Sequence, residues 1–134
     1  MSSAVRIPVR EGLFRDGDAP ALLGTRCGAC GSVHFPRADA CTYCATPDPA
    51  PIEIASEGTL WAWTAVTAPP PGYQGEVPFG VGVVEFPEGI RVIGRLAESD
   101  PNALTEGQAM TLRIEPLHRN DEGNEVVTYV FAPA

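Results

Sequence analysis

The chain is poor in the residues that enzymes use for chemistry. Histidine occurs only as His34 and His118 in 134 residues, and lysine does not occur at all. Neither a Gly-x-Ser-x-Gly nucleophile elbow nor a Walker phosphate-binding loop is present. We expect His34 to be solvated or to lie close behind a metal site, and His118 to lie at a surface turn. The sequence therefore predicts no catalytic residue.

Long apolar runs are missing as well. No stretch approaches the roughly 18 uninterrupted apolar residues that a membrane-spanning helix needs. Residues 1–6 do not contain the apolar segment of a signal peptide. We therefore expect a cytoplasmic protein without a membrane span, in which the cysteines are reduced.

Positive charge is scarce and unevenly placed. Nine arginines stand against 17 acidic residues, for a formal net charge of -8. Residues 1–37 carry five arginines and three acids, whereas the remaining 97 residues carry four arginines and fourteen acids. An acidic body repels phosphate backbones, which disfavours nucleic-acid binding. An anionic ligand would be expected in the basic N-terminal third.

The four cysteines form two Cys-x-x-Cys pairs, Cys27 with Cys30 and Cys41 with Cys44, ten residues apart. This spacing is typical of a four-thiolate zinc site, in which each pair occupies a tight turn. Gly31 follows the first pair and can take the positive φ that lets backbone N–H groups face the sulfurs. We predict one structural Zn²⁺ per chain, because four thiolates leave no ligand position for water.

Two other uses of the cysteines remain open at this point. Two disulfides would need an oxidising compartment, which the N-terminal residues do not indicate. A thioredoxin-like redox pair is expected beside a βαβ unit, and the sequence does not predict one. Zinc is therefore the preferred interpretation. A closed site of this kind contributes on the order of 10 kcal/mol of folding free energy in zinc-finger peptides.

The chain divides near a proline-rich stretch. Residues 46–51 contain three prolines and predict a linker. Before it, residues 21–26 predict a strand and residues 10–16 a short helix. After it, β-branched and aromatic residues predict five strands, with room for one helical turn between the third and fourth. These strands are expected at residues 58–67, 79–86, 90–96, 110–117 and 125–131.

Five strands with glycines that permit sharp coiling suit a small Greek-key barrel of the OB type. We therefore predict a mainly β protein in two parts. Residues 1–50 form an N-terminal segment with a rubredoxin-like zinc ribbon, and residues 51–134 form a five-stranded OB-fold barrel.

Several residues outside the cysteines are candidates for a ligand or partner surface. Trp61 and Trp63 lie two apart on a predicted strand, so we expect them on one face, either packed against the N-terminal module or free to bind. The apolar loop 68–78 is a predicted docking surface. Arg26 and Arg37 flank the cysteines, where they would neutralise the thiolates or hold a phosphate. The partner or coenzyme A surface is thus predicted to include Arg26, Arg37, Trp61, Trp63, Pro71, Tyr73 and Phe79.

Several of these motifs together resemble a known family. They are Cys27 to Arg37, the second cysteine pair, Gly58-Thr59-Leu60, Thr64 and Val66, the Pro78-Phe79-x-Val81-x-Val83-Val84-Glu85 stretch and Gly89-Ile90-Arg91. In this combination and order the chain is similar to the zinc-ribbon plus OB-fold proteins called DUF35. Ala45 stands where a glycine often follows the last cysteine in that family.

The resemblance implies a non-catalytic subunit of a thiolase-superfamily complex. Such complexes act on acyl-CoA thioesters by thiolysis, aldol cleavage of steroid side-chain esters or acyl transfer, which places them in lipid or steroid metabolism. The resemblance implies a hetero-oligomer with acyl-CoA at or near the shared interface. The alternative interpretation is a nucleic-acid-binding zinc/OB module, and a third is an enzyme active by itself.

Overall fold

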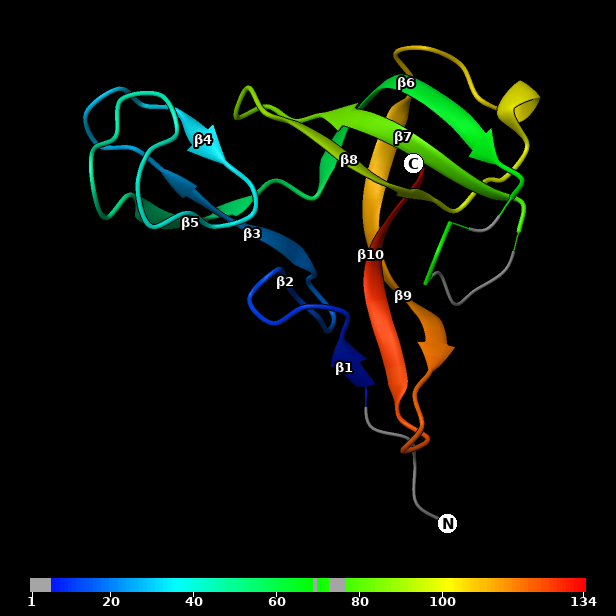
Figure 1. The fold of residues 1–134 in the computed structure, drawn as a ribbon. Coiled ribbons are helices and arrows are strands. Elements are labelled where there is room, and N and C mark those ends of the chain that lie inside the picture. Colours follow the sequence, from blue (N-terminus) through cyan, green and yellow to red (C-terminus); the bar gives the residue numbers. More distant parts are fainter. Residues whose placement is uncertain (1–5, 69, 73–76) are drawn as a thin grey trace.

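The computed structural model describes residues 6–68, 70–72 and 77–134 (Figure 1). Strand follows strand almost throughout the described residues, with one short 3-10 helix, η1 (Pro101–Ala103), in the connector where a helical turn was predicted. The five predicted C-terminal strands are all present. They are β6 (Glu57–Val66), β7 (Phe79–Glu85), β8 (Arg91–Leu96), β9 (Ala109–Arg119) and β10 (Glu125–Pro133).

These five strands close into a barrel. Around it the order is β9, β6, β7, β8 and β10, and β10 pairs again with β9. All neighbouring pairs are antiparallel except β8 with β10, which is parallel. Strands one, two, three, five and four of the barrel are thus consecutive neighbours, which is the OB order, and the predicted barrel is confirmed.

Side chains on the inner faces of the strands fill the barrel interior. On β7 the buried side chains recur at every second position, as a sheet with one face toward a core requires, and on β8 Val92 and Leu96 keep this spacing. Strand β10 instead has buried residues on both faces. The largest fully buried side chains of the barrel belong to Leu60, Val84, Met110, Val127, Val130 and Phe131. Gly94 sits on the inner face, where a Cβ would lie 2.7 Å from the ring of Phe131. The glycine therefore lets the strands wrap tightly around the aromatic core.

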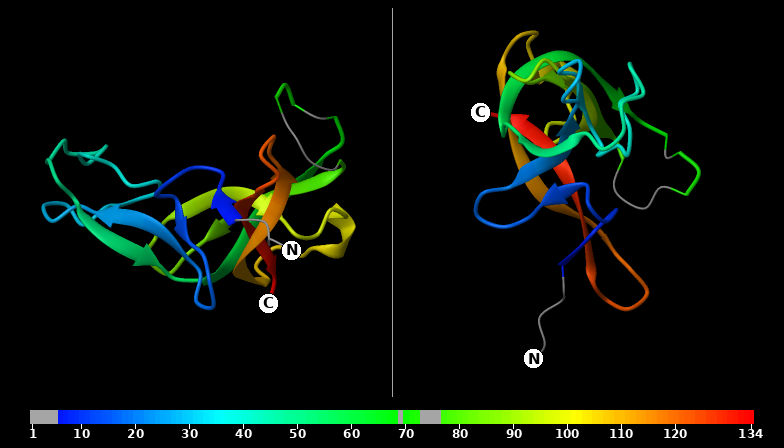
Figure 2. Two further views of the ribbon diagram at one scale, coloured as in Figure 1. Left: turned by 90° about the horizontal axis from the view of Figure 1, so that it is seen from below. Right: turned by 90° about the vertical axis from the view of Figure 1, so that its left-hand side faces the viewer.

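A second, smaller sheet forms the zinc ribbon around the predicted strand β3 (Ala21–Arg26). One edge of β3 pairs with β5 (Ala50–Ile54). The other edge pairs first with β2 (Phe14–Arg15) and then with β4 (Val33–His34). Figures 1 and 2 show this ribbon at one end of the barrel, beside the hairpin that joins β7 to β8.

Two local predictions are wrong. Residues 10–16 do not form a helix, because Gly12 has a φ of 77° and turns the chain so that Phe14 and Arg15 become β2. The proline-rich linker is also shorter than predicted, since Pro51 lies in β5 opposite Thr25. Among the described residues β5 pairs with β3 alone, and an edge strand tolerates proline where its missing N–H would face away from the ladder.

Ribbon and barrel share one apolar core. Leu13, Phe14, Leu22 and Ile54 from the ribbon side join the barrel side chains in a single buried cluster. The ring of Tyr129 on β10 meets Phe35 edge-on at 5.6 Å. The N-terminal strand β1 (Arg6–Pro8) pairs in parallel with β10. In the part of the chain that is described, no helix is long and apolar enough to span a membrane.

Candidate metal centre

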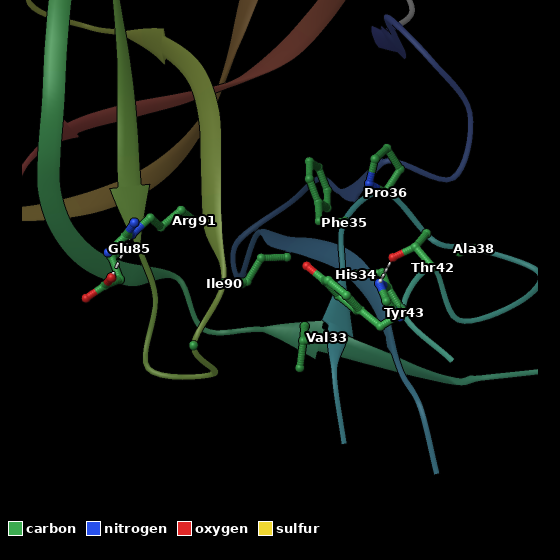
Figure 3. A pocket seen from close by; sticks show the side chains of 11 residues that line it. Val33, His34, Phe35, Pro36, Ala38, Thr42, Tyr43, Glu85, Ile90 and Arg91 are labelled. Atoms are coloured by element: carbon green, nitrogen blue, oxygen red, sulfur yellow. Dashed lines mark hydrogen bonds and ion pairs between the residues drawn. The ribbon is translucent and has the colours of Figure 1, made fainter. Parts of the chain in front are cut away.

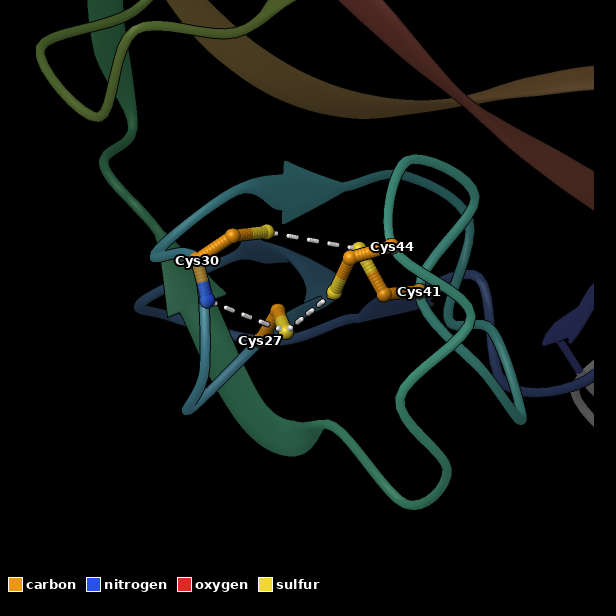
Figure 4. A group of neighbouring side chains, drawn as sticks. All are labelled: Cys27, Cys30, Cys41 and Cys44. Atoms are coloured by element: carbon orange, nitrogen blue, oxygen red, sulfur yellow. Dashed lines mark hydrogen bonds between the residues drawn. The ribbon is translucent and has the colours of Figure 1, made fainter.

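The four cysteines come together at the far end of the ribbon (Figure 4). Their sulfur atoms all lie within 4.8 Å of one another. Cys27 and Cys41 are buried, whereas Cys30 and Cys44 are exposed. Among the residues that the structure describes, no other group of three or more histidine, cysteine or acidic side chains lies close enough to hold a metal ion.

The two turns that carry the cysteines repeat the same hydrogen bonds. In the first turn the N–H of Gly31 donates to the carbonyl of Cys27, and in the second the N–H of Ala45 donates to the carbonyl of Cys41. The N–H groups of Ala29 and Tyr43 point at the first sulfur of each turn, at 3.4 Å in both cases. Because each turn aims backbone N–H groups at its sulfur, both are suited to hold thiolates.

Both turns end in the left-handed region of backbone conformation. Gly31 has a φ of 76°, as its position in the sequence predicted, and Ala45 has a φ of 63°. Glycine takes this conformation without a steric penalty, whereas alanine does not. The second turn therefore carries strain that the first turn avoids.

The cysteine thiols of the cluster differ in pKa. The pKa of Cys27 is lowered from its ordinary value of 9.0 to about 6, above all by the N–H of Cys30 and also by the N–H of Ala29. The pKa of Cys30 is lowered by its contacts with the hydroxyl and the backbone of Ser32, and burial raises the pKa of Cys41. Four sulfurs in one cluster, two of them already disposed to lose a proton, match the donor set that Zn²⁺ prefers.

A hollow of about 620 Å³ separates the ribbon from the barrel next to the second cysteine turn (Figure 3). The rings of His34 and Tyr43 stack there with their centroids 5.7 Å apart. His34 is buried, with its Nδ1 3.3 Å from the hydroxyl of Thr42 in the second cysteine turn. Of the two expectations for His34, the solvated position is wrong, and a position close behind the cysteine cluster agrees with this contact. Ile90 and Arg91 face these residues from the barrel side. Sequence reasoning did not find this hollow, because its two walls are more than forty residues apart in the chain.

Trp61 and Trp63 do not share a face. The register of β6 against β7 shifts between Leu60 and Ala62, which places a bulge at Trp61. Trp61 is half exposed with the guanidinium of Arg91 4.2 Å above its ring, whereas Trp63 packs against the core and donates from its indole N–H to the carbonyl of Pro101. A bulge adds one residue to a strand, so it breaks the simple alternation on which the prediction rested.

The other predicted surface residues are spread over the molecule. Arg26 donates to the carbonyl of Gly31, and Arg37 is exposed on the ribbon. Phe79 begins β7 at the end away from the ribbon, where the guanidinium of Arg95 lies 5.1 Å from its ring. Pro71 is exposed, and Tyr73 lies outside the described residues. Arg26 and Arg37 therefore lie on the ribbon and Phe79 at the opposite end of the molecule, while the predicted docking loop 68–78 lies partly outside the described residues. The role of all these residues in binding stays a prediction.

Two family models match consecutive parts of the chain. Residues 14–50 match the rubredoxin-like zinc ribbon domain of ChsH2, and residues 51–115 match the C-terminal OB-fold domain of ChsH2. Together the two matches cover the ribbon and most of the barrel, in the order in which the structure has them.

Relatives with assigned names agree with these matches. The chain is 26% identical over 114 residues to a DUF35 domain-containing scaffold protein of Methanocaldococcus jannaschii, covering 82% of this chain and 78% of the relative. It is 26% identical over 116 residues to the benzoylsuccinyl-CoA thiolase subunit BbsA of Thauera aromatica, covering 87% of this chain and 78% of BbsA. Among solved structures, a chain described as Ltp2-ChsH2(DUF35) aldolase superposes with a TM-score of 0.64 at 27% identity, covering 84% of each chain. With the ribbon, the barrel and the cysteine cluster in place, the chain belongs to the DUF35 family, whose members join a ChsH2-type zinc ribbon to an OB-fold.

Proposed function

We propose that this protein is a non-catalytic, zinc-binding subunit that completes a thiolase-superfamily complex acting on acyl-CoA thioesters. The observation that carries the proposal is the closed cluster of four sulfurs in a ribbon that shares its core with an OB barrel. One Zn²⁺ held by Cys27, Cys30, Cys41 and Cys44 would have no open ligand position. The metal would then stabilise the fold and take no part in a chemical step.

The names of relatives support a partner of the thiolase superfamily. BbsA of Thauera aromatica is named as a subunit of benzoylsuccinyl-CoA thiolase, and the superposed structure is named as an aldolase of Ltp2 with ChsH2. Each name puts a protein similar to this chain in an assembly with a second protein. The reaction of the complex would be a thiolysis, an aldol cleavage or an acyl transfer, carried out by residues of the partner.

Acyl-CoA would bind at or near the interface between the two subunits. Coenzyme A carries several phosphate charges, and the body of this chain is strongly acidic. The basic N-terminal third is the favourable place for those charges, and Arg26 and Arg37 are its exposed arginines beside the cysteine turns.

The direct test is to purify the tagged protein from its host and identify what is retained with it. We expect a thiolase-superfamily protein whose activity on an acyl-CoA thioester falls when this chain is left out, and about one zinc per chain by metal analysis. The Cys27→Ser variant should lose zinc and partner together. Ala29→Ser is the matched control, since it changes the same turn and leaves all four sulfurs in place.

Three outcomes would contradict the proposal. One is a partner that is fully active without this chain. Another is turnover of an acyl-CoA by the isolated chain, which would make it an enzyme. The third is tight, salt-sensitive binding to single-stranded nucleic acid, which would favour the alternative of a nucleic-acid-binding module.

A further inference from the structure

Part of strand β8 is an open edge of the barrel. Strand β8 pairs with β10 only at Arg95 and Leu96, while β1 pairs with the lower part of β10 at residues 125–127. Residues 91–94 of β8 therefore have β7 on one side and, among the described residues, no strand on the other. Unpaired strand edges are ready templates for a strand from another chain.

The hydrogen-bonding groups along this edge can be assigned. The N–H of Phe86 donates to the carbonyl of Ile90 at 2.9 Å, so Ile90 and every second residue after it direct their backbone groups toward β7. Arg91 and Ile93 must then direct theirs outward. The hydroxyl of Tyr129 agrees with this assignment, because it donates to the carbonyl of Ile93 at 2.9 Å. The N–H groups of Arg91 and Ile93 and the carbonyl of Arg91 remain for an added strand.

A groove of about 410 Å³ runs along the open edge and gives an added strand its place. Its far wall consists of Arg10 and Leu13, which follow β1, and of Phe35 and Pro36 on the ribbon. Figure 3 shows Phe35 and Pro36 on the ribbon side, across from Arg91 on the barrel side. The groove is thus formed where the N-terminal segment, the ribbon and the barrel meet. Ile93, at its rim, is 65% exposed and is the most exposed aliphatic side chain among the large apolar residues described.

The charge of the groove is opposite to that of the molecule. Its lining contains Arg10 and Arg91 and no acidic residue, on a chain with a net charge of -8. Arg10 has no ion-pair or hydrogen-bond partner among the described residues. Arg91 is bound through its Nε to Glu85 at 2.9 Å, on the side of the neighbouring hollow. Carboxylates are the groups that complement such a groove, and charge complementarity of this kind selects partners.

We propose that the open edge of β8 binds an extended, carboxylate-bearing segment of a partner protein as an added β-strand. Arg91 and Ile93 lie two apart on one strand, so their side chains share a face. The segment would place an acidic side chain opposite Arg91 and, two residues away, an aliphatic side chain opposite Ile93. A second acidic side chain would meet Arg10. That the segment belongs to the thiolase-superfamily subunit rests on the proposed function.

A peptide titration tests the groove without the partner. The probe is the blocked peptide Thr-Glu-Thr-Val-Thr-Glu-Thr, whose glutamates and valine lie on one face when it is extended, and the control probe has lysine in place of both glutamates. Amide NMR spectra of the full chain should shift at Arg91, Ile93 and Tyr129 with the acidic probe only. No shift, shifts at other strands, or equal binding of the lysine probe would overturn the proposal. Concentration-dependent shifts of the same amides without peptide would show a second copy in the groove and would also overturn it.

Variants separate the contributions of charge and backbone. Arg10→Glu should weaken binding of the acidic probe by about fivefold or more, whereas Arg113→Glu, on β9 and with 57% of its side chain exposed, should leave it unchanged. Ile93→Pro removes an outward N–H that β7 does not use, and should abolish binding. Ile93→Glu, which keeps the backbone intact, should abolish it as well and covers the case in which the proline variant does not fold. Unchanged binding by Arg10→Glu and Ile93→Glu would refute the groove.

The outcome can be told apart from that of the proposed function. If wild type retains a thiolase-superfamily partner and Ile93→Glu retains it equally well, the groove proposal is wrong and the proposed function stands. If wild type binds the acidic probe in the groove but retains no such partner, the groove proposal stands and the proposed function is wrong.

Discussion

Replacing Ala45 by glycine should strengthen the metal site. Ala45 has a φ of 63°, in the left-handed region that costs a residue with a Cβ about 1–2 kcal/mol. Glycine removes this cost, but it also lowers the stability of the fold by about 0.4–1 kcal/mol, because a glycine makes the unfolded chain more flexible. The net gain is about 0.5–1 kcal/mol. Since zinc binding and ribbon folding are coupled, this gain should appear as zinc affinity raised by about two- to fivefold.

The measurement is competition for zinc against a colorimetric chelator, with denaturant unfolding of the zinc-loaded protein as a second readout. Gly31→Ala should have the opposite effect, because Gly31 has a φ of 76° and a Cβ there would meet nothing within 4 Å, so only backbone strain changes. Ala29→Gly is the control, since Ala29 is outside the left-handed region and should only lose affinity. If Ala45→Gly weakens zinc binding as Ala29→Gly does, the account of strain in the second turn is wrong.

Three further predictions concern packing and protonation. Gly24→Ala should destabilise the protein by about 1–3 kcal/mol in denaturant unfolding, because a Cβ would lie 2.5 Å from a carbonyl oxygen of β4, whereas Gly28→Ala, with nothing within 4 Å, should change stability little. Trp63→Phe should cost about 1 kcal/mol through loss of the 2.8 Å hydrogen bond to η1, and an unchanged unfolding midpoint would contradict this. Zinc affinity should fall as the pH is lowered, and more steeply below about pH 6, where protons also compete for the Cys27 thiolate, whose pKa is about 6; an affinity that does not change between about pH 8 and pH 5 in a dye assay would contradict this.

The parts of the fold that depend on local chemistry were predicted correctly. The two Cys-x-x-Cys turns and the positive φ of Gly31 follow from the residues within each turn. The five barrel strands follow from runs of β-branched and aromatic residues bounded by turns, and their ends differ from the predicted ones by a few residues. Such features need no information from distant parts of the chain.

The errors arose where a neighbour in space decided the outcome. The helix expected around residues 10–16 gave way to β2 because Phe14 pairs with Leu22 and is buried in the shared core. Pro51 entered a strand because β5 lies at an edge of the ribbon sheet. Trp61 and Trp63 lie on different faces because β6 has a bulge where it pairs with β7. None of these contacts is visible in the local pattern.

By itself, then, the sequence determined which residues can hold a metal, where the strands lie and which sign of charge dominates, because spacing, alternation and composition are properties of short stretches. Only the tertiary structure decided that ribbon and barrel share one core and that β8 pairs with β10 at its last two residues alone. It also decided that Arg10 and Arg91, 81 positions apart, line one groove. These are long-range arrangements, set by how strands close into a barrel and by what packs against its open edge.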